Sequence, residues 1–242
     1  MPRKKTTKKE EAFKIPQLAS PGFKVENKKL TEKQKEFLSL SLDQNTRIMF
    51  ICGPAGCSKT YMAVYSALRH LSNNNNYDLM YIRTVIESAE KGLGALPGDI
   101  ADKFNPYIAP LQDKLDEMLP AKNTAPTVMK ELMDERVEAL PINFLRGANW
   151  INKIVIADEA QNFTFKELTT LITRLGENSK LFICGDFMQS DINGKSGFAP
   201  MYDIFNDDDS KLKGIHCFRF TKDDIMRDEL LKFIIGKLEK RK

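Results

Sequence analysis

One short segment combines glycines with a lysine and a hydroxyl residue at the spacing that phosphate binding needs. Residues 53–60 read GPAGCSKT and nearly match the pattern G-x-x-x-x-G-K-[ST]. Glycines let the backbone wrap so closely that successive N–H groups point at one anion, and the following helix adds its positive end. We expect Lys59 to reach the β- and γ-phosphates of ATP and Thr60 to coordinate Mg²⁺. The residues expected to hold the nucleotide are Gly53, Pro54, Ala55, Gly56, Cys57, Ser58, Lys59, Thr60 and Tyr61.

Ser58 departs from this pattern, which has a glycine before the lysine. A side chain is tolerated there if the residue has helical dihedral angles, but it narrows the loop. The departure bears on the rate of hydrolysis more than on nucleotide binding. The segment follows an apolar run and precedes a helical pattern, which is the context that a phosphate-binding loop requires.

A second polar group follows the apolar run at residues 154–157. Ligands of open parallel sheets bind beside the carboxyl ends of the strands, so Asp158 and Glu159 are expected at that edge. Asp158 can hold Mg²⁺ through water, and Glu159 can orient and deprotonate an attacking water. The alternative is a strand followed by a polar helix cap. Two adjacent carboxylates repel each other, so a cation is expected nearby.

A third apolar run, at residues 181–184, delivers Gly185, Asp186 and then Gln189 to the same edge. Gln189 is expected to sense the γ-phosphate, unless the segment is a simple strand-to-turn junction. The three motifs occur in chain order on separate predicted strands. Together they are far more specific for a nucleotide site than any one of them.

Short apolar runs alternate with helical patterns along the chain. This alternation predicts an α/β fold in which one parallel sheet carries helices on both faces. Capping boxes at residues 31–34 and 164–167 predict helix starts, and Gly176 predicts the end of the second of these helices. Strands are expected at residues 48–52, 79–82, 154–158, 181–184 and 215–220. Further helices are expected at residues 59–71, 100–104, 111–119, 127–135 and from 221 to the end.

The charge is unevenly distributed along the 242 residues. The net charge is +4, yet residues 1–30 alone hold nine Lys or Arg against three Glu, which leaves the body slightly acidic. We expect residues 1–28 to form a flexible basic arm and residues 29–242 to form the folded domain. The arm can neutralise phosphates of a nucleic acid, or it can be a solubilising tail or partly an expression remnant.

Composition also excludes some classes of protein. No apolar run approaches the ~20 residues that a membrane helix needs, and the N-terminus is basic rather than signal-like, so no membrane is expected. The four cysteines form no C-x-x-C pair, and the two histidines lie far from any metal-like spacing. A cytoplasmic protein without a His/Cys metal site is therefore expected.

These motifs resemble the PhoH-like proteins, and the resemblance covers residue 30 to the end. It includes the 53–60 loop, the box at residues 158–162 and the segments at 173–176 and 185–189. Residues 83–87 and 94–99 match as well, although Thr84 stands where a proline is common. The resemblance implies a single RecA-like P-loop NTPase domain related to the superfamily 1 helicase core. It also implies a bacterial or phage ATPase in the bacterial cell or infected host cytoplasm, linked in some members to RNA unwinding or processing.

Further roles follow from the resemblance alone. Gln34 lies where related helicases read adenine with a glutamine, or it is an exposed helix residue. Arg174 and Arg227 are candidates for a transition-state arginine, which a neighbouring subunit can supply. Arg83 and Arg146 are candidates for contact with nucleic acid or phosphate. Trp150 can stack a base, although core or interface packing is the favoured role.

The functional hypothesis is a nucleic-acid-associated ATPase or helicase that uses ATP and Mg²⁺, acting on single-stranded RNA or DNA. One chain is too short to hold two RecA-like lobes, so a second copy must complete the site, and a homohexameric ring is expected. The alternative is a non-hydrolysing nucleotide switch that gates assembly or a partner ribonuclease. A small-molecule kinase is a third possibility, but a kinase does not require the water-activating Glu159.

Overall fold

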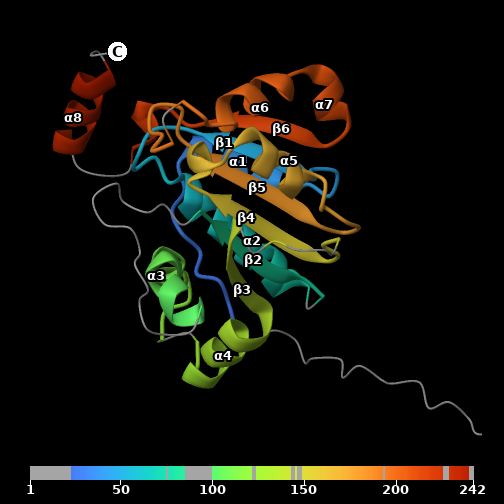
Figure 1. The fold of residues 1–242 in the computed structure, drawn as a ribbon. Coiled ribbons are helices and arrows are strands. Elements are labelled where there is room, and N and C mark those ends of the chain that lie inside the picture. The colour runs from blue at the N-terminus through green and yellow to red at the C-terminus, as the bar shows by residue number, and fades with distance from the viewer. Residues whose placement is uncertain are drawn as a thin grey trace, which may run out of the picture.

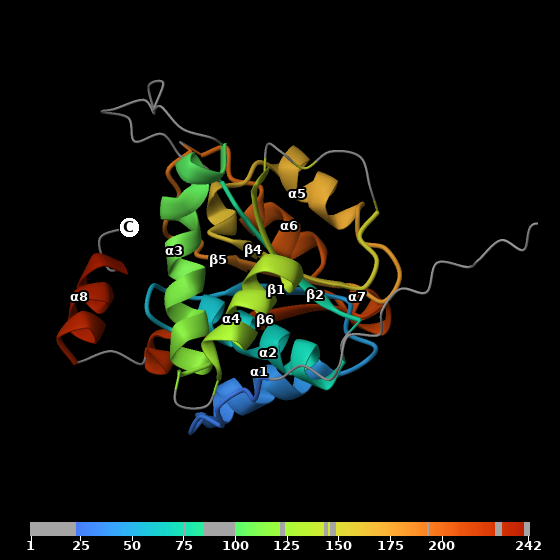
Figure 2. The same cartoon turned by 90° about the horizontal axis from the view of Figure 1, so that it is seen from below.

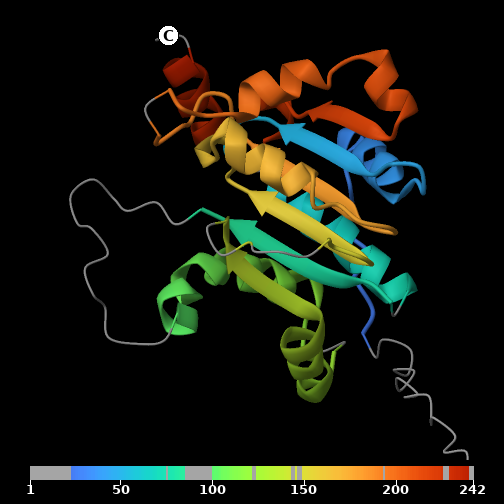
Figure 3. The same cartoon turned by 45° about the vertical axis from the view of Figure 1, so that its right-hand side comes forward.

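A parallel sheet forms the centre of the computed structural model (Figure 1). The structure describes residues 23–74, 76–84, 100–121, 124–142, 145, 149–192, 194–225 and 229–239. Within these ranges six strands pair in the order β3-β2-β4-β5-β1-β6, and every pair is parallel. Figure 3 shows the strands running side by side in one direction, so their carboxyl ends share one edge. The strands are β1 (Ile48–Cys52), β2 (Asp78–Arg83), β3 (Val137–Pro141), β4 (Lys153–Asp158), β5 (Lys180–Gly185) and β6 (Ile215–Arg219).

Helices cover both faces of the sheet (Figures 1 and 2), as the sequence predicted. One face packs against α1, α2 and α3, and the other against α5 and α6. The α-helices are α1 (Glu32–Leu42), α2 (Lys59–Asn73), α3 (Ile100–Met118), α4 (Pro126–Glu131), α5 (Phe165–Ile172), α6 (Phe198–Ile204), α7 (Asp208–Leu212) and α8 (Glu229–Glu239). Shorter turns of helix within the described residues are η1 (Leu132–Arg136), η3 (Ala160–Asn162) and η4 (Lys222–Asp224).

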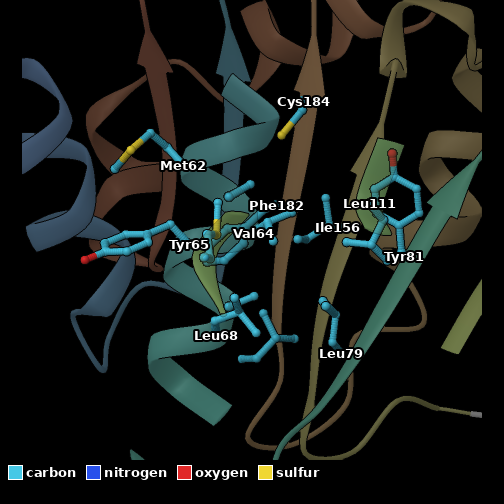
Figure 4. Close-up of a cluster of buried hydrophobic side chains, with 14 of the residues drawn as sticks. Met62, Val64, Tyr65, Leu68, Leu79, Tyr81, Leu111, Ile156, Phe182 and Cys184 are labelled. Carbon is cyan, nitrogen blue, oxygen red and sulfur yellow. The ribbon is translucent and has the colours of Figure 1, made fainter. Parts of the chain in front are cut away.

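Alternation along the strands divides the core into two clusters, because successive side chains of a strand point to opposite faces. On the α2 face, Val64 and Leu68 pack with Ile156 and Phe182 of the sheet (Figure 4). On the other face, Val155 and its neighbours pack against α5 and α6. Burial on both faces explains why β1, β4 and β5 read as continuous apolar runs.

Both predicted capping boxes are confirmed. The Thr31 side chain accepts from the backbone N–H of Gln34, whose side chain accepts in return from Thr31 at 3.1 Å. Thr164 and Glu167 make the same reciprocal pair at the start of α5. These bonds satisfy N–H groups that would otherwise be unpaired at the two helix starts.

Some predicted elements were wrong or incomplete. The two helices expected in residues 100–119 are one helix, α3, which continues through Pro106 and Pro110. The edge strand β3, with Glu138 and Pro141, was not predicted, because it lacks an apolar run. Helix α5 ends at Ile172 rather than Leu175, and η4 precedes α8 where one final helix was expected.

The packed body begins before residue 29. Phe23 and Val25 are buried in the core on the α2 face, and the N–H of Glu26 donates to the carbonyl of Met118. Residues 23–28 therefore pack against α2 and α3, which corrects the expected boundary of the arm; the rest of the arm, residues 1–22, lies outside the described residues. In the described part of the chain, none of the helices is both long and apolar enough to cross a membrane.

Candidate nucleotide-binding site

The phosphate-binding motif forms the loop between β1 and α2, as predicted. Ser58 is the N-cap of α2 and has φ 70° and ψ 19°, which is the left-handed region. These are not the right-handed helical angles at which a side chain is free of strain. A left-handed conformation costs a non-glycine residue roughly 1–2 kcal/mol. The left-handed backbone at Ser58 therefore favours glycine at this position.

The start of the loop has no space for a side chain. A Cβ on Gly53 would lie 2.7 Å from Sγ of Cys57 and 2.8 Å from Cβ of Phe220. The backbone of the loop thus passes directly against the end of β6. Burial raises the pKa of the Cys57 thiol to about 11, so the thiol is a buried, protonated packing group.

The ammonium group of Lys59 lies against the backbone of the loop. Its Nζ donates to the carbonyl oxygens of Gly53 at 2.6 Å and Pro54 at 2.9 Å. These bonds hold a positive charge at the mouth of the loop. To reach phosphate oxygens, the ammonium exchanges these carbonyl acceptors for stronger, charged ones.

Asp158 links the second motif to the loop. Oγ1 of Thr60 donates to Oδ1 of Asp158 at 2.6 Å, and the hydroxyl of Tyr81 donates to Oδ2 at 2.5 Å. Asp158 is only 4% exposed, so both hydrogen bonds compensate a buried carboxylate. Burial and the neighbouring Asp158 raise the pKa of Tyr81, which stays a neutral donor.

Glu159 follows directly and also has a strained backbone, with φ 55° and ψ 43°. Its Oε2 accepts from Nε2 of Gln161 at 2.6 Å, and its Oε1 lies 3.4 Å from Nη2 of Arg83. Arg83 thus places a positive charge beside Glu159. Strained residues persist where the surroundings hold them, and they cluster at functional sites.

The third motif lies between the other two. Because β5 separates β1 from β4, the residues after β5 lie between the phosphate loop and the acids. The N–H of Asp186 donates to Oε1 of Gln161 at 3.0 Å, and Oδ1 of Asp186 accepts from the N–H of Met188 at 2.8 Å. The N–H of Gln189 donates to the carbonyl of Asp186 at 3.4 Å.

These groups line one cavity of about 680 Å³. Its wall includes most of the residues predicted to bind nucleotide or act in hydrolysis: Gln34, Ala55, Gly56, Ser58, Lys59, Thr60, Tyr61, Asp158, Glu159 and Gln189. Gln34 is buried, so the alternative of an exposed helix residue is wrong. Gly53 and Pro54 line a smaller groove of about 370 Å³ on the other side of the loop.

Other predicted residues lie elsewhere. The carbonyl of Arg174 accepts from the N–H of Trp150, which precedes β4, so Arg174 lies at the opposite edge of the sheet from the cavity. Arg174 therefore cannot act on the cavity of its own chain. Trp150 is buried in the core on the α5 face, which confirms its packing role. Arg227, Arg146 and residues 85–99 lie outside the described residues.

Sequence reasoning missed several residues of the site. Tyr81 reads only as one apolar position of a strand, although it bonds to Asp158. Lys114 and Glu117 come from α3, far along the chain from the motifs. Lys28 was counted as part of the arm, and Lys29 was counted only among the basic residues near it. No local signal marks these residues, because their place in the wall depends on how α3 packs. Gln161 carried a signal, since it belongs to the box at residues 158–162.

Comparison with known proteins matches most of the chain to one family. The family model described as PhoH-like protein matches residues 26–239. The PhoH-like protein of Bacillus subtilis (strain 168) is 35% identical over 214 residues, covering 87% of this chain and 63% of that protein. Protein PhoH of Escherichia coli (strain K12) is 34% identical over 203 residues, covering 83% and 55% respectively. The chain thus spans less than two thirds of the length of these curated relatives.

Two solved helicases also align. Bacteroides sp Pif1, in complex with ADP-AlF4, has 18% identity and a TM-score of 0.39, covering 86% of this chain and 45% of that chain. The DUF1998 helicase MrfA, bound to DNA, has 12% identity and a TM-score of 0.42, covering 79% and 27% respectively. The family assignment rests on the sequence matches. The match over residues 26–239 and the identity to these relatives show that the chain belongs to the PhoH-like protein family.

Proposed function

We propose that this chain binds ATP with Mg²⁺ and hydrolyses it, as a nucleic-acid-associated ATPase or helicase. The observation that carries the proposal is the 2.6 Å hydrogen bond between Thr60 and Asp158, with Glu159 next in sequence. This bond brings the end of the phosphate loop to the acids after β4. A P-loop NTPase needs that combination to hold phosphates, a metal ion and a water in one place.

The residues present suit Mg²⁺, which prefers oxygen ligands and keeps several waters. The Thr60 hydroxyl and the Asp158 carboxylate present hard oxygen atoms to the cavity. The described residues hold no group of three or more His, Cys, Asp and Glu that would enclose a metal. Such a sparse site fits an ion that is completed by water and phosphate oxygens. When bound, Mg²⁺ neutralises charge on the β- and γ-phosphates.

The proposed reaction is attack by water in line on the γ-phosphorus. The oxygen of the water forms the new bond, the bond to the β,γ-bridging oxygen breaks, and that oxygen leaves on ADP. Glu159 accepts the proton that the water loses, which yields ADP and inorganic phosphate. Lys59 supports charge on the β- and γ-phosphates, and Gln189 contacts the γ-phosphate. Gln34 and Tyr61 hold the base end of the nucleotide.

The site requires a second copy of the chain in this proposal. Arg174 is excluded from its own cavity, so it can act only on the cavity of a neighbour, and Arg227 remains the other candidate. A head-to-tail contact repeated around an axis closes into a ring, for which we propose a homohexamer. Light scattering with and without ATP tests this assembly. A monomer under all conditions would contradict it.

The proposed partner is single-stranded nucleic acid, with RNA favoured, and a partner ribonuclease is a further candidate. Arg83 supports this because it lies beside Glu159 at the edge of the sheet. The basic residues 1–28 support it by charge. The test is ATP turnover for the native chain and for Glu159→Gln, each with and without single-stranded RNA and DNA. We expect stimulated turnover that falls by roughly 10²–10⁴-fold in the variant.

Two observations favour the non-hydrolysing switch as a second candidate. Ser58 strains the loop, and Arg83 lies close to the carboxylate that hydrolysis needs. A chain that binds ATP tightly but shows no turnover, with or without nucleic acid, would support the switch.

A further inference from the structure

Gln161 contacts the water-activating carboxylate directly. Its Nε2 lies 2.6 Å from Oε2 of Glu159, whereas the contact of Arg83 with Oε1 is longer at 3.4 Å. The closer contact sets the orientation of the carboxylate more firmly, because hydrogen bonds weaken steeply with distance. Gln161 is 4% exposed, so surrounding atoms confine its side chain to this arrangement.

The orientation of the Gln161 amide group is determined by a backbone group. A backbone N–H can only donate, so the N–H of Asp186, 3.0 Å away, must face the amide oxygen. The NH₂ end therefore faces Glu159, where it can only donate. The opposite orientation, in which the amide oxygen would face and repel the carboxylate, is therefore excluded.

The same side chain joins two of the motifs. Asp186 begins the loop that carries Gln189, and its carbonyl accepts from the N–H of Gln189. Gln161 thus connects the carboxylate of Glu159 with the loop of the proposed γ-phosphate sensor. The carbonyl of Gln161 also accepts from the hydroxyl of Ser190 at 3.2 Å, which adds a second bond to that loop.

We propose that Gln161 is a positioning residue for ATP hydrolysis. It holds the carboxylate of Glu159 towards the attacking water and transmits the position of the Gln189 loop to it. This inference rests on the proposed function. A purely structural role is the competing explanation, because Gln161 also holds η3 against the loop.

The neighbouring residue offers a matched control. Asn162 joins the same turn to the same loop through Asp191, with bonds of 3.2 Å and 2.8 Å. Asn162 is as buried as Gln161, but among the described residues its side chain bonds to Asp191 and not to Glu159. A structural role would make both residues equally important. A positioning role makes only Gln161 important for the chemical step.

The experiment measures kcat and KM for ATP with Mg²⁺ in the full chain, the Kd of a non-hydrolysable ATP analogue, and Tm. Gln161→Glu keeps an oxygen for the N–H of Asp186 but removes the donor to Glu159. We expect kcat to fall by about 10- to 100-fold, with KM and Kd within about threefold, because small misplacements of a catalytic group cost that much.

Gln161→Met, of similar size, is the second variant if Gln161→Glu fails to fold. It should show the same fall in kcat with KM and Kd nearly unchanged. Asn162→Ala should lower Tm and keep kcat within about threefold.

Each result decides between the explanations. The positioning role would be overturned if both folded Gln161 variants had the kcat of the native chain. It would also be overturned if Asn162→Ala lost as much kcat as the Gln161 variants. Either result would leave the proposed ATPase intact. A native chain that binds ATP without turning it over would overturn the proposed function, and the positioning role with it. A rise in Kd or KM as large as the fall in kcat would show that Gln161 serves binding rather than hydrolysis, which also overturns the inference.

Discussion

The hydroxyl of Thr60 donates a 2.6 Å hydrogen bond to Oδ1 of Asp158, although 98 positions separate the two residues. The bond joins the first turn of α2 to the end of β4. Both residues line one cavity.

Asp158→Asn should nearly abolish Mg²⁺-dependent ATP turnover. The amide keeps the size of the carboxylate but loses the charge that attracts the ion. Metal ions contribute several kcal/mol of transition-state stabilisation, so a loss of about 10²–10³-fold is expected. Turnover measured against Mg²⁺ concentration checks this, with the exposed Asp209→Asn as a control for the loss of one charge. Equal activity of the two variants would remove Asp158 from the metal site.

Tyr81→Phe should destabilise the fold by about 1.5–3 kcal/mol, because it removes a hydrogen bond to a buried charged group. Tyr65 is a comparison at equal burial: its hydroxyl donates to the neutral carbonyl of Glu26 and accepts from Nη2 of Arg69. Because Arg69 keeps its hydrogen bond to Asn27 in Tyr65→Phe, this variant should cost only about 0.5–1.5 kcal/mol. Urea unfolding of the three proteins measures the difference. A larger loss for Tyr65→Phe would show that the bond to Asp158 contributes little.

Ser58→Gly should raise the free energy of unfolding by up to about 1 kcal/mol. Relief of left-handed strain, about 1–2 kcal/mol, is partly offset by the greater freedom of glycine in the unfolded chain. Asn178→Gly is the control, because Asn178 has φ 52° but asparagine tolerates this region better. Its effect should be smaller. Denaturant unfolding measures both, and an Asn178→Gly gain as large as that of Ser58→Gly would argue against strain at the phosphate loop.

Stability should decline as the pH falls below about 6.5, in part because of His70. Burial lowers the pKa of His70 below its ordinary value of 6.5, so the unfolded chain takes up a proton first. The contribution of His70 is therefore fully present above pH 6.5 and is lost as the pH falls through the folded pKa. Burial lowers the pKa of His216 in the same direction.

His70→Gln isolates this contribution, because the amide can still donate to the carbonyl of Ser41 that His70 contacts at 3.2 Å. Between pH ~7 and ~5 the variant should lose less stability than the native chain. Above pH ~7.5 the difference between the two proteins should be constant, since His70 is neutral in both states there. Parallel curves over the whole range would show that His70 does not titrate with folding.

Local patterns predicted much of the fold. The strands β1, β2, β4, β5 and β6 were predicted to within about one residue at each end, because buried parallel strands are short apolar runs with polar ends. The exception is β3, an edge strand that pairs with β2 although Glu138 and Pro141 interrupt its apolar residues. The prediction divided α3 at its prolines. The structure has one continuous helix, which buries Leu111, Leu115 and Met118 in the core. Tertiary contacts override local propensity in both cases.

By itself the sequence determined which residues are candidates for the chemistry: the loop from Gly53 to Thr60, the acids Asp158 and Glu159, and Gln189. Each follows a strand, and strand ends can be read from local residue types. Only the tertiary structure decided that β5 lies between β1 and β4, that Tyr81 and Arg83 contact the two acids, and that Gln161 joins Glu159 to Asp186. The physical reason is that hydrogen bonds between distant segments depend on strand order and side-chain packing, which no local pattern encodes.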